Sequence, residues 1–351
     1  MKLLDRFEKL DCFKKVVKYA NDEKSRLKAA RALAGPRLFY AVVRGDGDNV
    51  GRLLDGWLPY NWYEKMKKII YELSAEGDKQ QFEIDRERAL GVLDALEKYA
   101  YTLAEELGET QQYPPLIITP TFRVAISRAM AISALRDWAA VERHGGLLIY
   151  AGGDDVVALT PVEDSLEVAA ECRRGYWGED GFYKAGDYAI PALTAYGRSF
   201  VVRYAHVMDI MSEEFLKSYE ELELYSKGAK WGTHEKDSIT ISSSRTSARS
   251  VLPFRDATVV ERLVDLWAML LAGVLSSNMP YDVDGALGDG GDVVKQNFDV
   301  YVKLVRRAIK RNVVNENLAE KVVEVMRGGA AYGAEFLEGV KEAVKILRGL
   351  P

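Results

Sequence analysis

Hydrophobic residues recur with two different periods along this chain, and these periods separate helical regions from sheet-forming ones. Residues 1–34 carry apolar side chains at spacings of three among Lys, Glu and Ala, which indicates amphipathic helix. Gly35 and Pro36 end this region, because neither residue favours continuing a helix. Residues 38–43 are instead one continuous apolar run, which predicts a strand buried on both faces.

The middle of the chain alternates between helical and extended patterns. Residues 57–118 are rich in Glu, Lys, Tyr and Leu and predict helices inserted after the first strand. Residues 122–141 follow an N-cap threonine and a proline, and predict a helix packed on a sheet. Further along, we expect a hairpin, a helix, an extended segment and a last strand, at residues 147–159, 165–174, 189–205 and 238–242.

The resulting order of strand, helix, hairpin, helix and strand predicts an α+β fold. It is the ferredoxin-like βαββαβ arrangement, with helices on one face of the sheet, that polymerase palms and class III nucleotide cyclases share. Helical periodicity returns near residue 255 and continues to the end. We therefore expect an N-terminal helical segment, a palm domain with a helical insertion at 57–118, and a C-terminal helical domain, at residues 1–34, 35–254 and 255–351.

Composition and charge narrow the class of protein. With 351 residues, 48% hydrophobic and 29% charged, the chain is long enough and apolar enough to bury a core. Its net charge of -5 means that any contact with nucleic acid must be regional. Cys12 and Cys172 stand too far apart in sequence to indicate a zinc ribbon or a disulfide framework. The apolar run 266–275 falls short of the roughly 20 residues that a spanning helix needs, and the start has no signal-peptide core, so we expect a cytoplasmic protein without membrane contact.

The predicted hairpin carries a pair of acidic residues. Gly152 and Gly153 separate its two apolar strands, and central turn positions that need positive φ favour glycine. We therefore expect Gly152-Gly153 to form the turn and Asp154 and Asp155 to lie at its tip. Two adjacent carboxylates repel each other unless water, hydrogen-bond donors or a cation screens them.

A second acidic pair, Asp46 and Asp48, follows the first strand, which lies beside the hairpin in a ferredoxin-like sheet. Carboxylates meeting at one sheet edge form an oxygen-ligand site suited to Mg²⁺ or Mn²⁺. We predict that Asp46, Asp154 and Asp155 bind the metal and are catalytic. Such a site can activate a ribose hydroxyl for in-line attack on a nucleoside triphosphate. The residues predicted to bind the nucleotide there are Gly47, Asp48, Gly152 and Gly153.

Two other motifs begin at the same place, and neither is complete. Gly45-x-Gly47 begins like a dinucleotide-binding fingerprint, but its third glycine, Gly51, comes one residue late. A calcium loop would need oxygen ligands where Val50 and Trp57 stand. Both interpretations are therefore weaker than the metal-assisted nucleotide site.

With these motifs together, the chain resembles the large polymerase/cyclase subunit of type III CRISPR effector complexes, in its Cmr-type form. The Gly-Gly-Asp-Asp hairpin behind a Tyr-Ala strand is the most specific part of the resemblance. The segments that carry it are Arg44 to Gly51, Leu148 to Asp155, Ala229-Lys230 with Lys236-Asp237, and Leu275-Ser276-Ser277.

This resemblance implies a function and a set of partners. The implied activity is the joining of ATP into cyclic oligoadenylate with Mg²⁺ or Mn²⁺. The implied partners are other Cmr subunits, the guide CRISPR RNA and the target RNA. Lys230 and Lys236 look like the basic residues that the family places beside the phosphates.

The chain also departs from the family pattern. Members of the family usually begin with an HD nuclease domain, but none of the three histidines here is followed by Asp, so we expect no HD nuclease activity. No first palm is visible, so we expect a second palm domain to pair with this one, in the same chain or in another. Ala195-Tyr196-Gly197 replaces the Ser-Ala-Gly that the family often has, which puts base recognition in doubt. Arg198, at a strand end, is expected to be solvated.

Two alternatives remain open. A diguanylate-cyclase-like signalling enzyme uses the same palm and a similar acidic turn, although Val156-Val157 follows the acidic pair here. A catalytically silent scaffold subunit would keep the fold without turnover. The products formed from ATP and from GTP distinguish these possibilities.

Overall fold

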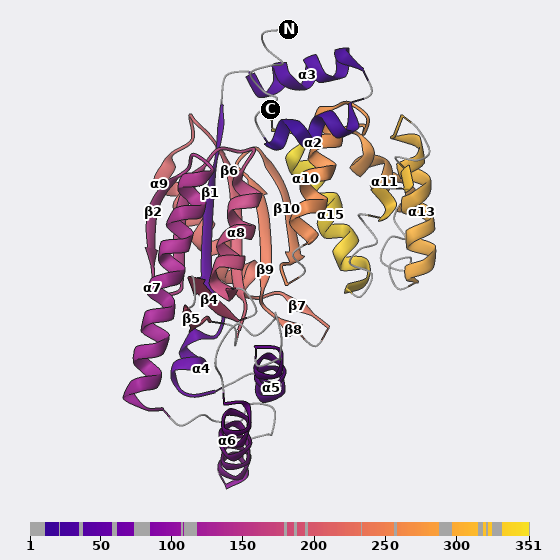
Figure 1. Ribbon diagram of the computed structural model, residues 1–351. Helices are drawn as coiled ribbons and strands as arrows, with labels where there is room; N and C mark the ends of the chain where they lie inside the picture. The colour runs from indigo at the N-terminus through magenta and orange to yellow at the C-terminus, as the bar shows by residue number, and fades with distance from the viewer. Residues whose placement is uncertain are drawn as a thin grey trace.

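The fold was analysed in a computed structural model of the chain (Figure 1). The structure describes residues 11–20, 22–34, 38–57, 62–73, 85–106, 108, 118–178, 181–185, 188–193, 196–232, 234–255, 258–287, 297–314, 319–320, 322–324 and 332–350.

Strands and helices follow one another much as the hydrophobic pattern predicts. The strands are β1 (Phe39–Gly47), β2 (Leu147–Gly152), β3 (Asp155–Thr160), β4 (Phe182–Ala185), β5 (Tyr188–Pro191), β6 (Arg198–His206), β7 (Lys230–Trp231), β8 (His234–Glu235), β9 (Ser238–Ser243) and β10 (Thr246–Pro253). The helices before β6 are α2 (Asp11–Tyr19), α3 (Glu23–Ala34), α4 (Val50–Leu54), α5 (Trp62–Leu73), α6 (Arg86–Glu106), α7 (Pro120–Arg143) and α8 (Ser165–Trp177). The later helices are α9 (Met211–Glu221), the π-helix η1 (Leu222–Ser226), α10 (Thr258–Leu271), α11 (Met279–Leu287), α13 (Phe298–Arg311) and α15 (Gly333–Leu347).

Six of these strands form one sheet in the order β10-β9-β6-β1-β3-β2. Strand β1 is antiparallel to both of its neighbours, β3 and β6. The elements β1, α7, β2, β3, α8 and β6 therefore form the predicted ferredoxin-like βαββαβ unit, which is confirmed. Strand β9 then pairs in parallel with β6 after α9, and β10 returns beside β9 as a hairpin, so the sheet is two strands wider than that unit.

Helices cover both faces of this sheet, so the prediction of helices on one face was incomplete. Successive side chains of a strand point to opposite faces. In β1, Ala41 and Val43 join the core that also contains Leu166 of α8. Arg44 points to the other face, where its Nε donates to the Ser218 hydroxyl of α9 at 3.2 Å. Any charged group of β1 in phase with Arg44 therefore lies on the side of α9.

Two hydrophobic cores hold the described elements together. The larger core joins the sheet and α8 to the C-terminal helices, for example through Leu252 of β10 and Val340 of α15. The smaller core joins the inserted helices to the first half of α7, through Tyr63, Leu93 and Ile126. Figure 1 shows α4, α5 and α6 at the end of the sheet opposite the two termini. The domain boundaries stay a prediction.

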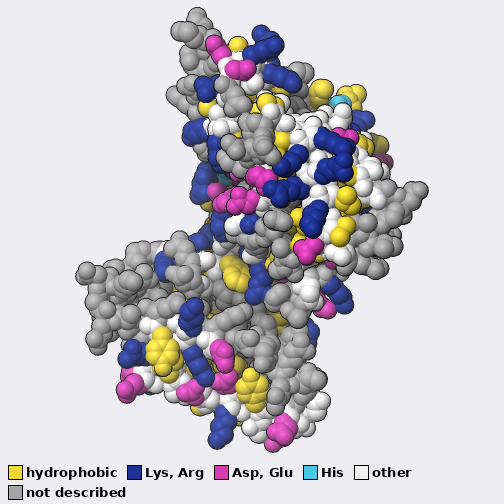
Figure 2. All heavy atoms as spheres, turned by 90° about the vertical axis from the view of Figure 1, so that its right-hand side faces the viewer, with side chains coloured by type: hydrophobic (Ala, Val, Ile, Leu, Met, Phe, Trp, Pro, Cys, Tyr) yellow, Lys and Arg dark blue, Asp and Glu magenta, His cyan; other side chains and the backbone are white. Residues whose placement is uncertain are grey.

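The surface of the C-terminal helices carries charges of both signs. Figure 2 looks onto the side of the molecule that lies on the right in Figure 1, where Lys and Arg side chains gather on the upper part with Asp and Glu side chains between them. Helix α13 contributes Lys310 and Arg311 in its last turn, where cations favour the helix dipole. Within the described residues, no helix combines the length and the apolar character needed to cross a bilayer.

Candidate active site

The turn of the acidic hairpin between β2 and β3 lies one residue later in the sequence than predicted. Gly152 pairs with Asp155 as the last rung of the ladder, so the turn consists of Gly153 and Asp154. Gly153 has a φ of 63°, whereas Gly152 lies in the strand. The prediction that Gly152-Gly153 forms the turn was therefore wrong, because the ladder runs one pair further. Asp154 lies in the turn and Asp155 begins β3.

Asp46 lies beside this hairpin, near the end of β1. Its backbone pairs with that of Ser199, and its side chain points to the face of α9 and η1. Burial, followed by the charge of Asp46, raises the pKa of Asp154 to about 6. The same two causes raise the pKa of Asp155. The structure thus brings Asp46, Asp154 and Asp155 together from the end of β1, the hairpin turn and the start of β3, as like charges that disfavour one another's ionisation.

The carboxylate oxygens of Asp46, Asp154 and Asp155 do not all lie within 4.8 Å of one another. Among the described residues, one group of His, Cys, Asp or Glu side chains has candidate ligand atoms that all lie within 4.8 Å of one another, and it is His144, Asp164 and Glu167. That group lies where α7 ends and α8 begins, and Lys15 already neutralises its Glu167. At the sheet edge, Asp46 and Asp154 interact through their side chains, but the three acidic residues do not form such a closed group.

Lys227 is the residue that pairs with Asp46. Its ammonium forms an ion pair with Asp46 Oδ2 and another with Glu223 Oε1 at 2.8 Å. Burial opposes the charged form, but the hydrogen bonds to the two carboxylates outweigh it and raise the pKa of Lys227. Lys227 was not predicted from the sequence, since 181 residues separate it from Asp46 and only its i,i+4 spacing from Glu223 is visible there.

Asp48 has a different environment from the other acidic residues. Its side chain is buried, with one carboxylate oxygen accepting from the Ser199 hydroxyl at 2.8 Å and the other from the Asp237 backbone N–H at 2.9 Å. Burial raises the pKa of Asp48 to about 7. The two oxygens thus join the end of β1 to β6 and to the turn before β9. A role in nucleotide binding stays a prediction.

The burial of Asp48 predicts a pH-dependent stability. Its pKa is about 7 in the folded chain against an ordinary 3.8, so between these values the folded state keeps a proton that the unfolded state has lost. Unfolding free energy should therefore fall as pH rises from 4 to 7, by up to about 1.4 kcal/mol per pH unit. Urea unfolding in EDTA should show a flatter pH dependence for Asp48→Asn than for wild type. Asp209→Asn, which removes a carboxyl whose pKa is lowered, should leave the slope above about pH 5 unchanged, because that carboxyl is ionised there in both the folded and the unfolded state. Equal slopes for wild type and Asp48→Asn would contradict this account.

Backbone strain is concentrated at the same end of the sheet. Three non-glycine residues in the described part of the chain have positive φ, namely Asn49 at 55°, Lys236 at 62° and Asp237 at 46°. Two of them are in direct contact, since Lys236 Nζ donates to Asn49 Oδ1 at 2.8 Å. Such conformations cost free energy and cluster at functional sites. The strain therefore supports a functional role for this edge of the sheet.

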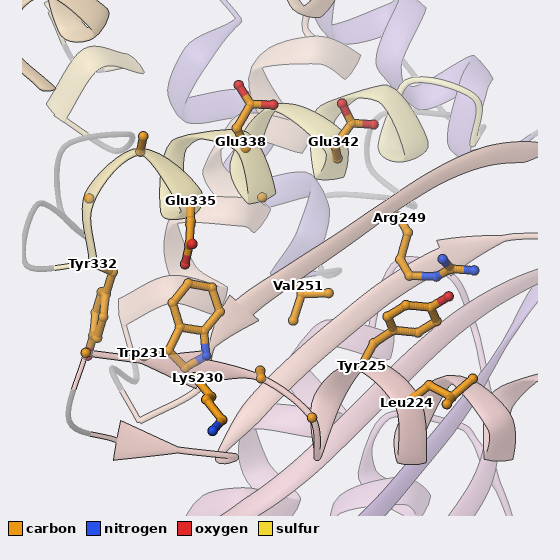
Figure 3. Close-up of a pocket in the computed structure, with 16 residues that line it drawn as sticks. Leu224, Tyr225, Lys230, Trp231, Arg249, Val251, Tyr332, Glu335, Glu338 and Glu342 are labelled. Atoms are coloured by element: carbon orange, nitrogen blue, oxygen red, sulfur yellow. The ribbon is translucent and has the colours of Figure 1, made fainter. Parts of the chain in front are cut away.

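The two predicted basic residues lie in different places. Lys236 is anchored beside the end of β1, where it donates to Asn49, the residue that follows Asp48. Lys230 is exposed and pairs with Glu235 at 3.3 Å, and it shows no contact with the three carboxylates within the described part of the chain. It borders a separate groove of about 1050 Å³, with Trp231 and Tyr332, between β7, β10 and α15 (Figure 3). Only Lys236 is thus placed at the acidic edge.

Arg198 contradicts the expectation that it is solvated. Its side chain is wholly buried, and its guanidinium forms an ion pair with Asp137 of α7 at 2.8 Å. It is the first residue of β6, opposite Gly47, and its side chain reaches the backbone of the hairpin turn. A charged side chain at a strand end is commonly exposed, and the buried Asp137 carboxylate is the reason that this one is not.

The donor set at the acidic edge fits a divalent cation. Asp46, Asp154 and Asp155 offer carboxylate oxygens only, which is the ligand type that Mg²⁺ and Mn²⁺ prefer. Burial, followed by the charge of Asp46, raises the pKa values of Asp154 and Asp155, although Lys227 already places one positive charge beside Asp46. A divalent ion would favour the ionised forms of both carboxyl groups. The metal itself stays a prediction.

The βαββαβ sheet and the carboxylates at its edge define a palm-type domain. Comparison with known sequences agrees, since the profile of the Cas10/Cmr2 second palm domain matches residues 39–240. The chain therefore belongs to the Cas10/Cmr2 family. The segments that carried the resemblance in the sequence lie mainly within the matched region.

Two curated relatives are described as Cmr2 subunits of CRISPR systems. The chain is 25% identical to the protein of Saccharolobus solfataricus over 246 residues, which cover 61% of this chain and 23% of that protein. It is 30% identical to the protein of Pyrococcus furiosus over 148 residues, which cover 42% of this chain and 13% of that protein. The aligned residues thus span less than a quarter of either relative.

Solved structures share the fold. A type III-B Cmr-beta structure in the apo state matches 95% of this chain and 41% of its own, with a TM-score of 0.64 and 21% identity. The Cmr-beta structure bound to cognate target RNA gives the same coverage, with a TM-score of 0.65. At this identity the likeness establishes the fold alone.

Proposed function

We propose that this chain is the nucleotidyl-transferring palm of a type III CRISPR effector subunit, and that it joins ATP into cyclic oligoadenylate. The observation that carries the proposal is the convergence of Asp46, Asp154 and Asp155 at one sheet edge, with raised pKa values on two of them. Membership of the Cas10/Cmr2 family adds the context of an RNA-guided complex.

In this proposal the side chains at the edge have separate tasks. Asp46, Asp154 and Asp155 hold Mg²⁺ or Mn²⁺, which supplies charge neutralisation and activation of the attacking hydroxyl when bound. Without a bound metal, Lys227 forms an ion pair with Asp46. If a metal ion took the place of Lys227 beside Asp46, the ammonium group could bind phosphate oxygens instead. Lys236 lies beside the end of β1, where it bonds to Asn49, and supplies a second positive charge for the triphosphate. Gly47, Gly152, Gly153 and Asp48 shape the surface against which the nucleotide lies.

The proposed partners follow from the relatives. Both curated relatives are Cmr2 subunits, and one structural neighbour is bound to cognate target RNA. We therefore include other Cmr subunits, the guide CRISPR RNA, the target RNA and a second palm domain among the partners, in the cytoplasm. The mixed charge of the face in Figure 2 favours RNA contacts confined to part of the surface.

The test compares ATP and GTP as substrates. The protein, alone and assembled with its complex and target RNA, is incubated with each radiolabelled nucleotide and Mg²⁺ or Mn²⁺, and the products are separated by chromatography. We expect cyclic oligoadenylate from ATP. Cyclic dinucleotide from GTP would favour the diguanylate-cyclase-like alternative. Absence of turnover in every preparation would overturn the proposal in favour of a scaffold.

A further inference from the structure

Arg198 joins the acidic hairpin to the rest of the palm. Its Nη1 and Nη2 donate to the two carboxylate oxygens of Asp137 at 2.9 and 2.8 Å, while its Nε donates to the backbone carbonyl of Asp154 at 3.0 Å. Its guanidinium also lies 5.0 Å from the centre of the Tyr176 ring. One fully buried side chain thus connects α7, α8 and the hairpin turn.

The carbonyl that Arg198 reaches belongs to a turn residue. Asp154 lies beyond the last pair of the β2–β3 ladder, which is Gly152 with Asp155. Strand β2 is the edge of the sheet, and its pairing with β3 is irregular between Leu148 and Tyr150. The ladder alone therefore constrains the turn weakly, and the bond from Arg198 adds a fixed point next to the side chain of Asp154.

We propose that Arg198 is a positioning residue, which holds the Asp154 turn so that its carboxylate meets those of Asp46 and Asp155. This inference rests on the proposed metal site. Supporting partners of this kind determine whether metal ligands stay within the tolerance that binding requires. The guanidinium suits the task because its rigid fork binds Asp137 through two nitrogens and leaves Nε for Asp154. A lysine at this position keeps the charge but cannot make all three bonds.

Arg203 provides a matched control on the same strand. It is also buried, and it pairs with Glu214 at 2.6 Å and with Glu221 at 3.0 Å. Both carboxylate partners belong to α9, its third partner is the Ser242 hydroxyl of β9, and none of these bonds reaches the hairpin. Arg203→Lys therefore disturbs a buried ion pair of similar kind without releasing the turn.

The experiment measures Mn²⁺ binding and amide hydrogen exchange, which need no turnover. For Arg198→Lys we expect Mn²⁺ affinity about tenfold weaker than wild type and faster exchange at residues 153–156. Arg203→Lys should leave both quantities at the acidic edge unchanged, even where it lowers stability. If Arg198→Lys fails to fold, Asp137→Asn replaces it, because it weakens the anchor of Arg198 and should also speed exchange in the turn.

The outcomes separate this inference from the proposed function. Wild-type exchange and Mn²⁺ affinity in a folded Arg198→Lys protein would overturn the positioning role. Equal effects of Arg198→Lys and Arg203→Lys would overturn it as well, because they would indicate a general loss of stability. Wild-type protein that binds no Mn²⁺ would overturn the metal site, and faster exchange at 153–156 in Arg198→Lys would then still establish Arg198 as the anchor of the turn.

Discussion

Asp154→Ala/Asp155→Ala protein should lose nucleotide product while remaining folded. The two carboxylates supply most of the oxygen ligands at the acidic edge, so their removal leaves Asp46 as the one predicted metal ligand. We expect product formation to fall by at least about 10²-fold, as is typical when preorganised electrostatic groups are deleted. The measurement is the rate of conversion of radiolabelled ATP in the presence of Mn²⁺.

Stability should move in the opposite sense to activity in this variant. Burial, followed by the charge of Asp46, raises the pKa values of Asp154 and Asp155, so the folded chain disfavours their ionised forms. Removing them removes both the cost of burying the charges and the repulsion from Asp46, and the contact from Arg198 to the backbone carbonyl of residue 154 is kept. The unfolding free energy should therefore equal or exceed that of wild type. Glu220→Ala, which removes an exposed carboxylate of α9, is the control and should retain activity. Wild-type turnover by the double variant would rule out the proposed catalytic role.

Gly47→Ala should also abolish activity, through packing and not through loss of a ligand. A Cβ at residue 47 would lie 2.6 Å from Tyr176 Oη, 2.7 Å from Asp154 Cβ and 2.8 Å from Val50 Cγ2. Tyr176 is buried against Arg198, so it has no room to move away. The hairpin must therefore shift from β1, which separates Asp154 from Asp46. We expect a loss of about 1–3 kcal/mol in unfolding free energy, as for other overpacked sites, and a large fall in Mn²⁺ affinity.

Gly51→Ala is the matched control for this prediction. Gly51 lies in α4, four residues further on, and a Cβ there would meet no atom within 4 Å. Alanine favours helix over glycine by about 0.5–1 kcal/mol, so this variant should be as stable as wild type or more so. Thermal unfolding and Mn²⁺ titration compare the stability and the Mn²⁺ affinity of the two variants. Similar behaviour of the two would show that the close approach at Gly47 is unimportant.

Much of the fold followed from local patterns. The apolar run after Pro36 became β1, and the glycines before Asp154 marked the hairpin. These two predictions were correct because a strand buried on both faces must be apolar throughout, and because positive φ favours glycine. The exact turn was missed by one residue, since the sequence does not show how far a ladder continues.

The candidate site was predictable only in part, for a related reason. Alternation along β1 places Asp46 and Gly47 on opposite faces, which the sequence already implies. It does not show what lies opposite each face. Lys227 meets Asp46, and Tyr176 with Asp154 fills the space beside Gly47, but both contacts join segments far apart in the chain.

By itself, the sequence determined the βαββαβ order, the acidic residues at strand ends and the family to which they point, because each depends on neighbours in the chain. The tertiary structure alone decided which charges are paired. Arg198 can be buried because Asp137 of α7 pairs with it, and Lys227, which follows η1, neutralises Asp46 of β1. Ion pairs form between side chains close in space, and their energies depend on burial, which no local pattern records.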